Sequence, residues 1–221
     1  MKKQKKPLQL KTKRLLLTAM TEAELAEKAA AERDGHMKNA YLEMLDGVRR
    51  EPELANFYTE WRITLRADGT EIGGAGFKGG QKELIVEIGY GVEPAHRGQG
   101  YAAEAVAALC EWAFSQQDVY YVQAETEPGN AASARVLEKC GFVPAGTGAE
   151  GPRYEKEKPA SCWMSIYLCL GVSVGLSFGT ALDNLALGMC IGMAVGVALG
   201  VSLDAQDRKT RKKFRGGGDG K

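Results

Sequence analysis

Runs of apolar residues along the first part of the chain predict a series of short β-strands. A leucine-rich run at 13–19 predicts the first strand, and residues 61–66 alternate apolar and polar side chains. Residues 71–78 follow a stretch of turn-forming residues and predict the partner strand of a hairpin. The β-branched run at 84–92 and the apolar run at 118–126 predict two further strands.

Helical signals lie between the first two strands. Thr21 and Glu24 form a capping box, which predicts a helix over about 22–33 that Asp34-Gly35 stops. Apolar residues spaced for one helical face predict a second helix over about 39–50. In this order the two helices connect the first strand to the hairpin.

Residues 101–140 predict two more helices. One covers 101–115, and the other starts after Asn130 and ends at Cys140-Gly141, where glycine can adopt the left-handed conformation. Residues 142–145 and 153–156 predict a closing pair of strands across a glycine-rich turn. Strands, helices and hairpins in this order predict an α/β (α+β) fold with a mixed sheet, neither a barrel nor a doubly wound sheet.

The C-terminal part of the chain has a different pattern. Residues 163–182 and 185–203 are uncharged segments of roughly 20 residues, and at about 1.5 Å per residue each matches the hydrocarbon thickness of a bilayer. Glycines recur every four residues in both segments, symmetrically about Asp183-Asn184. Such seams of small residues let two helices pack closely, so we expect an antiparallel two-helix hairpin.

These patterns divide the chain into three parts. We expect a folded domain over 8–158, the glycine-rich hairpin over 159–204 and a basic flexible tail over 205–221. We predict that the hairpin crosses a membrane through residues 163–203, and the alternative is a soluble glycine-rich hairpin buried in an oligomer. Basic flanks predict that both chain ends lie on the cytoplasmic face of the cell membrane, and the alternative location is the cytoplasm.

The net charge of +1 hides an uneven distribution. Residues 1–14 carry seven basic and no acidic side chains, and 204–221 carry seven basic and three acidic ones. Residues 15–203 therefore hold 15 basic and 25 acidic side chains. This pattern favours an anionic surface near the ends and a cationic substrate at the body, although solvated tails would give the same charges. No specific nucleic-acid partner is predicted.

The cysteines form no recognisable metal site. Five of them occur without a C-x-x-C pair, and the chain has only two histidines, so we expect no metal ion. No secretory signal is visible, because the basic start is followed by only a short apolar run. Reduced thiols in a cytosolic compartment are the expectation.

A candidate anion site follows the strand at 84–92. Pro94 ends the strand, Gly98 and Gly100 have no Cβ, and the next helix begins at Tyr101. The first amides of a helix have no intrahelical partner and point toward such a loop, which suits a phosphate or pyrophosphate. The spacing matches neither the G-x-G-x-x-G dinucleotide motif nor the P-loop.

Two motifs carry a resemblance to a known family. Val92-x-Pro94 followed by Arg97-x-x-Gly100-x-Ala102 resembles the acetyl-CoA loop of the GNAT superfamily of N-acetyltransferases. The segment 130–142 resembles the N-x-x-S-x-x-V-L-E-K-x-G-F helix of that superfamily, in the form found in ribosomal-protein alanine acetyltransferases. The resemblance covers about 8–157.

The resemblance implies a sheet whose two central strands splay apart, with acetyl-CoA as co-substrate between them. Backbone groups of the strand would bind the pantetheine arm, and the loop would hold the pyrophosphate. The residues expected to bind acetyl-CoA are Tyr90, Gly91, Val92, Arg97, Gly98, Gln99, Gly100, Tyr101, Ala102 and Asn130.

The resemblance also implies direct attack of an amine on the thioester, which needs a base for the amine and an acid for the thiolate. The two candidates for the base are Glu125 and Glu87. Leu137 stands where many family members have a tyrosine acid, so Ser133 and Tyr154 are the candidates for that role. Because no covalent intermediate is required, Cys110 and Cys140 are expected in the core.

The expected function is acetyl-CoA-dependent N-acetylation of a primary amine, either a peptide N-terminus or a small molecule. The acidic body favours a cationic acceptor. One alternative is a non-catalytic acetyl-CoA-binding module tethered to the membrane, and another is a membrane interaction protein with a decayed enzyme domain. The glycine-rich helices could also support an oligomer.

Overall fold

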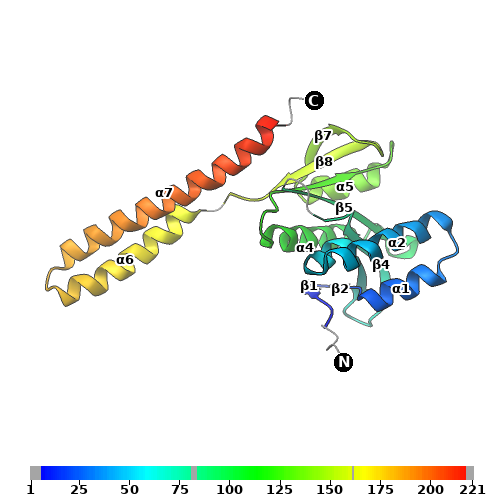
Figure 1. The fold of residues 1–221 in the computed structure, drawn as a ribbon, viewed down its shortest axis with the longest axis horizontal. Helices are drawn as coiled ribbons and strands as arrows, with labels where there is room; N and C mark the ends of the chain where they lie inside the picture. The colour runs from blue at the N-terminus through cyan, green and yellow to red at the C-terminus, as the bar shows by residue number, and fades with distance from the viewer. Residues whose placement is uncertain (1–5, 81–83, 161, 218–221) are drawn as a thin grey trace. The chain divides into compact units, whose positions relative to one another are not determined.

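The computed structural model describes residues 6–80, 84–160 and 162–217, with side chains as far as Arg211 (Figure 1). The chain divides into two compact units, residues 1–158 and 159–221. The first unit contains strands and helices, and the second contains two helices. The mixed α/β class and the C-terminal hairpin predicted from the sequence are both confirmed.

Within the described residues, eight strands form one sheet in the order β1-β2-β3-β4-β5-β6-β8-β7. The strands are β1 (Gln9–Lys11), β2 (Leu15–Ala19), β3 (Glu60–Leu65), β4 (Glu71–Phe77), β5 (Ile85–Val92), β6 (Tyr121–Glu125), β7 (Val143–Thr147) and β8 (Pro152–Glu157). Neighbouring strands are antiparallel except for β5 and β6, which are parallel. A parallel pair requires a crossover connection, and α4 (Tyr101–Ser115) provides it.

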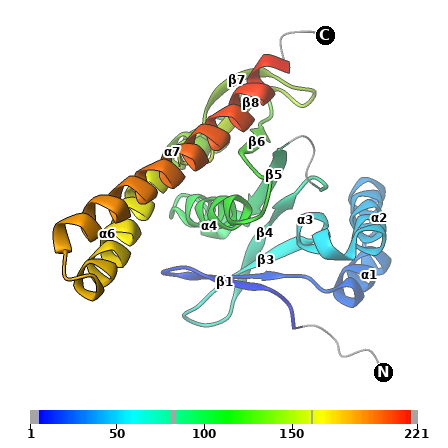
Figure 2. The ribbon, with the colours of Figure 1, turned by 60° about the vertical axis from the view of Figure 1, so that its left-hand side comes forward.

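The other helices of this unit are α1 (Glu22–Ala31), α2 (Gly35–Arg50), the short η1 (Pro52–Leu54), α3 (Ala55–Tyr58), η2 (Pro94–His96) and α5 (Ala131–Lys139). Figure 2 shows α4 lying against the sheet and α1 packed beside α2. The main core joins the sheet to α4 and includes Trp61, Phe77, Val106 and Leu109. Since α4 is fixed by this core, its first turn is held at the end of β5.

The structure corrects two predictions near the N-terminus. Asp34, expected to help stop the first helix, instead caps the second, because its carboxylate accepts hydrogen bonds from the amides of His36 and Met37 at 2.8 and 3.1 Å. Helix α2 therefore begins four residues earlier than predicted. Strand β1 was not predicted, because its three residues, Gln-Leu-Lys, contain a single apolar side chain.

In the second unit, α6 (Trp163–Ala181) and α7 (Leu185–Gly217) form an antiparallel pair. A Cβ on Gly175 would lie 3.2 Å from the Cα of Gly192 and against the carbonyl oxygen of Gly188. Similarly, a Cβ on Gly171 would lie 3.1 Å from the Cα of Gly196. The predicted glycine seam is confirmed, with backbone packed on backbone.

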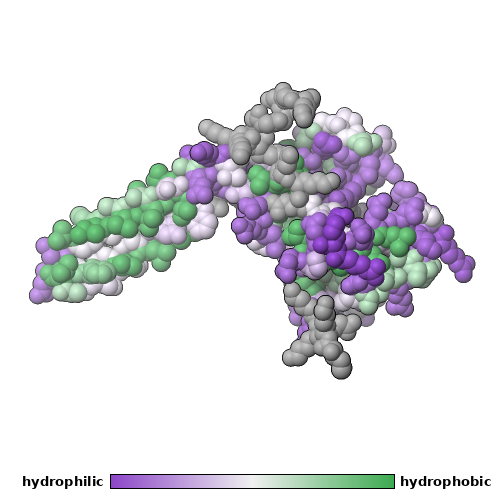
Figure 3. Space-filling view, in the orientation of Figure 1, coloured by the Kyte–Doolittle hydropathy of each residue, from purple (hydrophilic) through white to green (hydrophobic). Residues whose placement is uncertain are grey.

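Large apolar side chains cover the outside of this hairpin (Figure 3). Phe178, Leu182 and Leu170 are among the most exposed, at 63%, 60% and 54%. Both helices are long and apolar enough to cross a membrane. A continuous exposed apolar surface of this kind is suited to a lipid environment.

Polar contacts fix the two ends of the hairpin. At one end the side chain of Asn184 accepts a hydrogen bond from the amide of Leu187 at 3.0 Å. At the other end the carboxylate of Asp204 accepts hydrogen bonds from the amides of Trp163 and Met164 at 3.1 and 3.3 Å. Asp204 thus satisfies the first amides of α6 from the neighbouring helix.

Helix α7 continues beyond Leu203, where we predicted its end, to Gly217. The tail predicted as flexible from residue 205 is therefore helical over most of its length. Its residues are mostly good helix formers, and Asp207 and Arg211 form an ion pair at 3.0 Å across one turn. A polar helix therefore extends directly from the apolar one.

Candidate active site

The central strands of the sheet separate after a short paired segment. Strands β5 and β6 are paired through Ile85–Glu87 and Tyr121–Gln123. From Ile88 onward β5 is paired with β4 on its other side. The backbone groups of Glu87 and Glu93 bond to β4, so those of the alternate residues Ile88, Tyr90 and Val92 face the opening between β5 and β6, which we call the fork.

A loop with two left-handed glycines follows β5. Gly98 and Gly100 have φ angles of +75° and +80°, conformations that glycine adopts without strain. Gly100 occupies the N-cap position of α4, so the first amides of the helix point toward the loop. The side chain of Arg97 turns back and donates from Nε to the carbonyl oxygen of Val92 at 2.8 Å.

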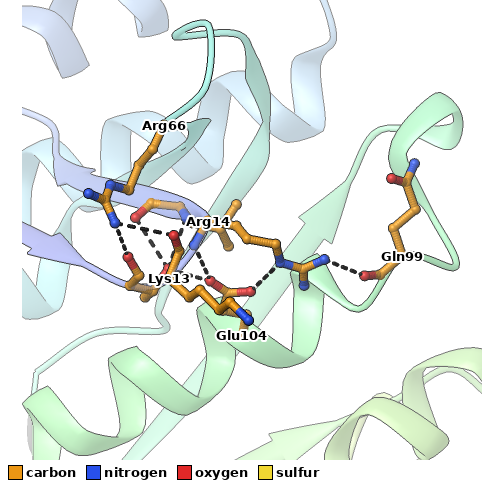
Figure 4. Close-up of polar contacts among 7 residues, drawn as sticks. Lys13, Arg14, Arg66, Gln99 and Glu104 are labelled. Atoms are coloured by element: carbon orange, nitrogen blue, oxygen red, sulfur yellow. Dashed lines mark hydrogen bonds and ion pairs between the residues drawn. The ribbon is translucent and has the colours of Figure 1, made fainter.

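Arg14, from the turn between β1 and β2, reaches this loop (Figure 4). Its Nε donates to Oε2 of Glu104 at 2.7 Å, and its Nη1 donates to the carbonyl oxygen of Gln99 at 3.0 Å. The guanidinium also lies over the ring of Tyr101, 4.4 Å from the ring centroid. Arg66 holds the turn itself by donating to the carbonyl oxygens of residues 12 and 13 at 2.6 and 3.2 Å.

Hydroxyl groups meet on the α5 side of the fork. Tyr90 Oη and Ser133 Oγ are 2.8 Å apart and share a hydrogen bond. The side chain of Asn130 accepts a hydrogen bond from the amide of Ser133 at 3.0 Å and caps α5. Burial raises the pKa of Tyr90, although the bond to Ser133 acts in the opposite direction and nearby Tyr154 adds to the increase.

Carboxylates lie on the opposite face of the sheet. Glu87 is paired with Gln123 across the parallel strands, and Glu125 is two residues further along, so the three side chains share one face. Glu87 Oε1 is 2.9 Å from Lys78 Nζ, which also lies 2.6 Å from Glu150 Oε2. Burial lowers the pKa of Lys78, but its bonds to the two glutamates outweigh this and the pKa lies above its ordinary value.

Glu125 is more enclosed than Glu87. It accepts a hydrogen bond from the amide of Glu150 at 2.8 Å and two from Arg153 at 2.8 and 3.0 Å, and its side chain is only 6% exposed. The backbone bond from Glu150 and the bonds from Arg153 hold the pKa of Glu125 below its ordinary value. The Glu87 side chain is 31% exposed.

Comparisons with known proteins identify the family. The model of the acetyltransferase (GNAT) domain matches residues 14–143, and that of the glycine zipper membrane protein matches residues 159–206. The chain belongs to the GNAT acetyltransferase family. The C-terminal match indicates that the hairpin associates with a membrane.

The uncharacterized N-acetyltransferase YjdG of Bacillus subtilis is 36% identical over 87 residues, which cover 39% of this chain and 52% of that protein. The chain therefore spans about half the length of this relative. An acetyltransferase from Agrobacterium tumefaciens superimposes with a TM-score of 0.53 at 25% identity, covering 68% of this chain and 94% of that structure. The ribosomal-protein-S5-alanine acetyltransferase of Vibrio fischeri gives 0.53 at 17% identity, with coverages of 68% and 97%. This last likeness concerns the fold.

The predicted site residues of this GNAT domain fall into three groups in the structure. The loop residues 97–102 lie at the start of α4, while Tyr90, Ser133, Asn130 and Tyr154 lie on the α5 side of the fork. The glutamates lie on the other face. Candidate acids and candidate bases are therefore on opposite sides of the sheet.

The fork and loop fit an extended ligand that carries a pyrophosphate. Among the described atoms, none lies within 4 Å of a Cβ built on Gly91 or on Gly98, so both backbones are accessible. Left-handed glycines and amides at the start of a helix are the groups that bind phosphates. The CoA part of acetyl-CoA has this chemistry.

Sequence reasoning missed Arg14 and Glu104, which lie outside the motifs. Tyr90 was predicted for its backbone groups, without a role for its phenol. A leucine-rich strand preceded by Lys13-Arg14 gives no sign of the distant loop, since the contact depends on the fold. The periodicity of α4, however, places Glu104 in its first turn, where a carboxylate is favourable.

Two cysteines behave as core residues. Cys110 is fully buried, and burial raises the pKa of its thiol to about 12. Cys140 is also buried and donates from Sγ to the carbonyl oxygen of Ala103 at 3.3 Å. A thiol with a raised pKa is a poor nucleophile, in line with the expectation for both residues.

Replacing Glu125 with glutamine should lower the unfolding temperature at pH 7 by about 3 to 10 °C, because the bonds to Arg153 lose their charge assistance. The pKa of Glu125 is lower in the folded state, so its stabilisation is present above the unfolded value and is lost as the pH falls through the folded value. The difference from the wild type should therefore shrink in acid. Thermal unfolding between pH 3 and 8 tests this, with exposed Glu127→Gln as control. Equal melting of Glu125→Gln and wild type at pH 7 would contradict it.

Proposed function

We propose that the chain is an acetyl-CoA-dependent N-acetyltransferase that acetylates a primary amine by direct attack. The observation that carries this proposal is the fork between β5 and β6, which opens toward the glycine loop at the start of α4. The chain that contains it belongs to the GNAT family. The name of its relative YjdG agrees with this reaction type. The acceptor is a peptide N-terminus or a small-molecule amine.

The proposed binding site follows the strand and the loop. Backbone groups of Tyr90 and Val92 pair with the pantetheine arm, because they face the fork, and Gly91 between them has no side chain to obstruct the arm. The amides of residues 97–102 hold the pyrophosphate. Asn130 contributes its amide group near the acetyl end, while its oxygen caps α5.

When bound, acetyl-CoA supplies the acetyl group as a thioester. Glu87 accepts the proton that the attacking amine loses, as the nitrogen forms its bond to the carbonyl carbon and the bond from carbon to sulfur breaks. An ammonium has a pKa near 10, so a base is needed at neutral pH. We favour Glu87 over Glu125, because Glu125 is enclosed and bonded to Arg153 and Glu150.

The thiolate receives its proton from the other side of the sheet. Leu137, in the place of the family's tyrosine, is completely buried and has no proton to give. The hydroxyl pair of Tyr90 and Ser133 provides an O–H donor beside the fork. Tyr154 on β8 is the second candidate for this step.

A second candidate function is a non-catalytic acetyl-CoA-binding module. Two observations favour it: Leu137 replaces the tyrosine, and Lys78 is bound to Glu87, the proposed base. An incoming ammonium must displace the Lys78 ammonium from Glu87. Acetyl-CoA binding without release of free thiol, across a panel of amines and peptides, would support the module and contradict the enzyme.

The sheet face that bears Glu87 favours a cationic acceptor. It carries Glu87 and Glu125, and the adjacent turn contributes Glu150, against the two cations Lys78 and Arg153. We place the domain on the cytoplasmic face of the membrane, because acetyl-CoA is a cytosolic metabolite and the residues after Leu203 are strongly basic. The hairpin then anchors the enzyme near this surface.

Replacing Gly100 with valine should abolish acetyl-CoA binding, because a side chain would fill the space over the helix amides. The control is Gly69→Val in the turn between β3 and β4, where glycine has a similar φ of +77° and open space around it. Both variants place valine at a similar positive φ, so calorimetry separates loss of the site from the effect of a strained backbone. Retained affinity in Gly100→Val would rule out the assigned loop.

Replacing Glu87 with glutamine should lower kcat at pH 7 by about 100-fold and leave the Kd for acetyl-CoA unchanged, because only proton transfer is lost. Turnover should recover partly at higher pH, where more of the amine is deprotonated. Thiol release with a panel of cationic amines measures this, and Glu71→Gln on β4 is the control. Full activity of Glu87→Gln together with loss of activity in Glu125→Gln would assign the role of the base to Glu125.

The hairpin should keep the protein in the membrane pellet after a carbonate wash. In intact cells, a membrane-impermeant maleimide should label Asn184→Cys at the far turn but reach Cys162 only after the membrane is disrupted. Single-cysteine variants of the full chain test this. Labelling of Cys162 in intact cells would contradict the cytoplasmic placement.

A further inference from the structure

Arg14 is held rigidly by an acidic partner in the first turn of α4. Oε1 of Glu104 accepts hydrogen bonds from the backbone amide of Arg14 at 2.8 Å and from the hydroxyl of Thr12 at 2.6 Å. Burial raises the pKa of Glu104, but the bonds from Thr12 and Arg14 outweigh this and hold the pKa below its ordinary value. Glu104 is therefore a charged and well-fixed support for the guanidinium (Figure 4).

The orientation of Arg14 leaves one nitrogen facing the loop. Nε is bonded to Glu104 and Nη1 to the carbonyl oxygen of Gln99. The third nitrogen, Nη2, lies 3.6 Å from the position that a Cβ on Gly100 would take. Arg14 has a side chain that is 41% exposed, so a ligand from solvent can reach it.

A second cation approaches Gly100 from another element. Nζ of Lys139, the last residue of α5, lies 4.0 Å from the same Cβ position. The helix end at Gly100 is itself positive, although Glu104 in the first turn offsets part of this charge and that of Arg14. Two cationic side chains that lie within 4.0 Å of one point beside this helix end favour an anionic ligand group there.

We propose that Arg14 and Lys139 bind the diphosphate of acetyl-CoA beside Gly100, with Glu104 as the positioning residue of Arg14. This assignment rests on the proposed function, and it adds two side chains from distant parts of the chain to the loop amides. A fixed guanidinium binds phosphate oxygens with directed hydrogen bonds, whereas the lysine supplies a point charge.

Calorimetry of the full chain in detergent tests the assignment with three ligands: CoA, dephospho-CoA, which retains the diphosphate, and pantetheine, which has no phosphate. Arg14→Gln and Lys139→Gln should each weaken CoA and dephospho-CoA binding about tenfold or more and leave pantetheine binding unchanged. Arg14→Lys should recover part of the loss. Lys13→Gln removes the same charge next to Arg14 and should bind all three ligands as the wild type does.

The variant Glu104→Gln tests whether Glu104 positions Arg14 for the ligand or only stabilises the fold. It should weaken CoA binding several-fold without changing pantetheine binding, since Arg14 loses its anchor but the fork is intact.

Equal losses of affinity for CoA and pantetheine in these variants would overturn the assignment, as would losses of affinity no larger than in Lys13→Gln. A loss limited to CoA would assign the two cations to the 3′-phosphate and overturn the diphosphate contact. A wild type that binds none of the ligands would overturn the proposed function itself.

Discussion

The pairing of β5 with β6 over only three residues is the constraint on which the site depends. Backbone groups must find hydrogen-bond partners, and a strand edge that leaves its neighbour within a sheet can offer them to a ligand. The core under α4 keeps β5 in place on its other side, through β4. The same core fixes the start of α4 at the end of β5, so the fork and the loop are held together by one packing arrangement.

Local signals made much of this fold predictable. The capping box, the strand that Pro94 ends and the left-handed Gly141 each act within a few residues, and the corresponding elements occur close to where they were expected. The early start of α2 was missed because Asp34-Gly35 suits the end of one helix as well as the start of the next. The α7 extension differs from the prediction because a run of charged residues suits a helix as well as a flexible tail, and lysine and arginine favour helices.

The site was only partly readable for a physical reason. The loop motif is contiguous, so its glycines could be identified from spacing alone. Arg14, Glu104 and Lys139 meet because the β1–β2 turn, α4 and α5 converge, and no pattern within one segment records that. The two candidate bases differ in burial and partners, Glu125 being bonded to Arg153 and Glu87 to Lys78, and such a difference arises from tertiary structure.

The hydrogen bonds from the first amides of α6 to Asp204 hold the start of α6 beside residue 204 of α7. Helix α6 has 19 residues, which give an apolar length of about 28 Å. Because the turn and the Asp204 cap hold both ends, one helix cannot slide along the other to lengthen the span. A span of fixed length makes the hairpin a gauge of bilayer thickness: in a thicker membrane the bilayer thins around it, or flanking side chains reach toward the interface, at a cost of fractions of a kcal/mol per Å.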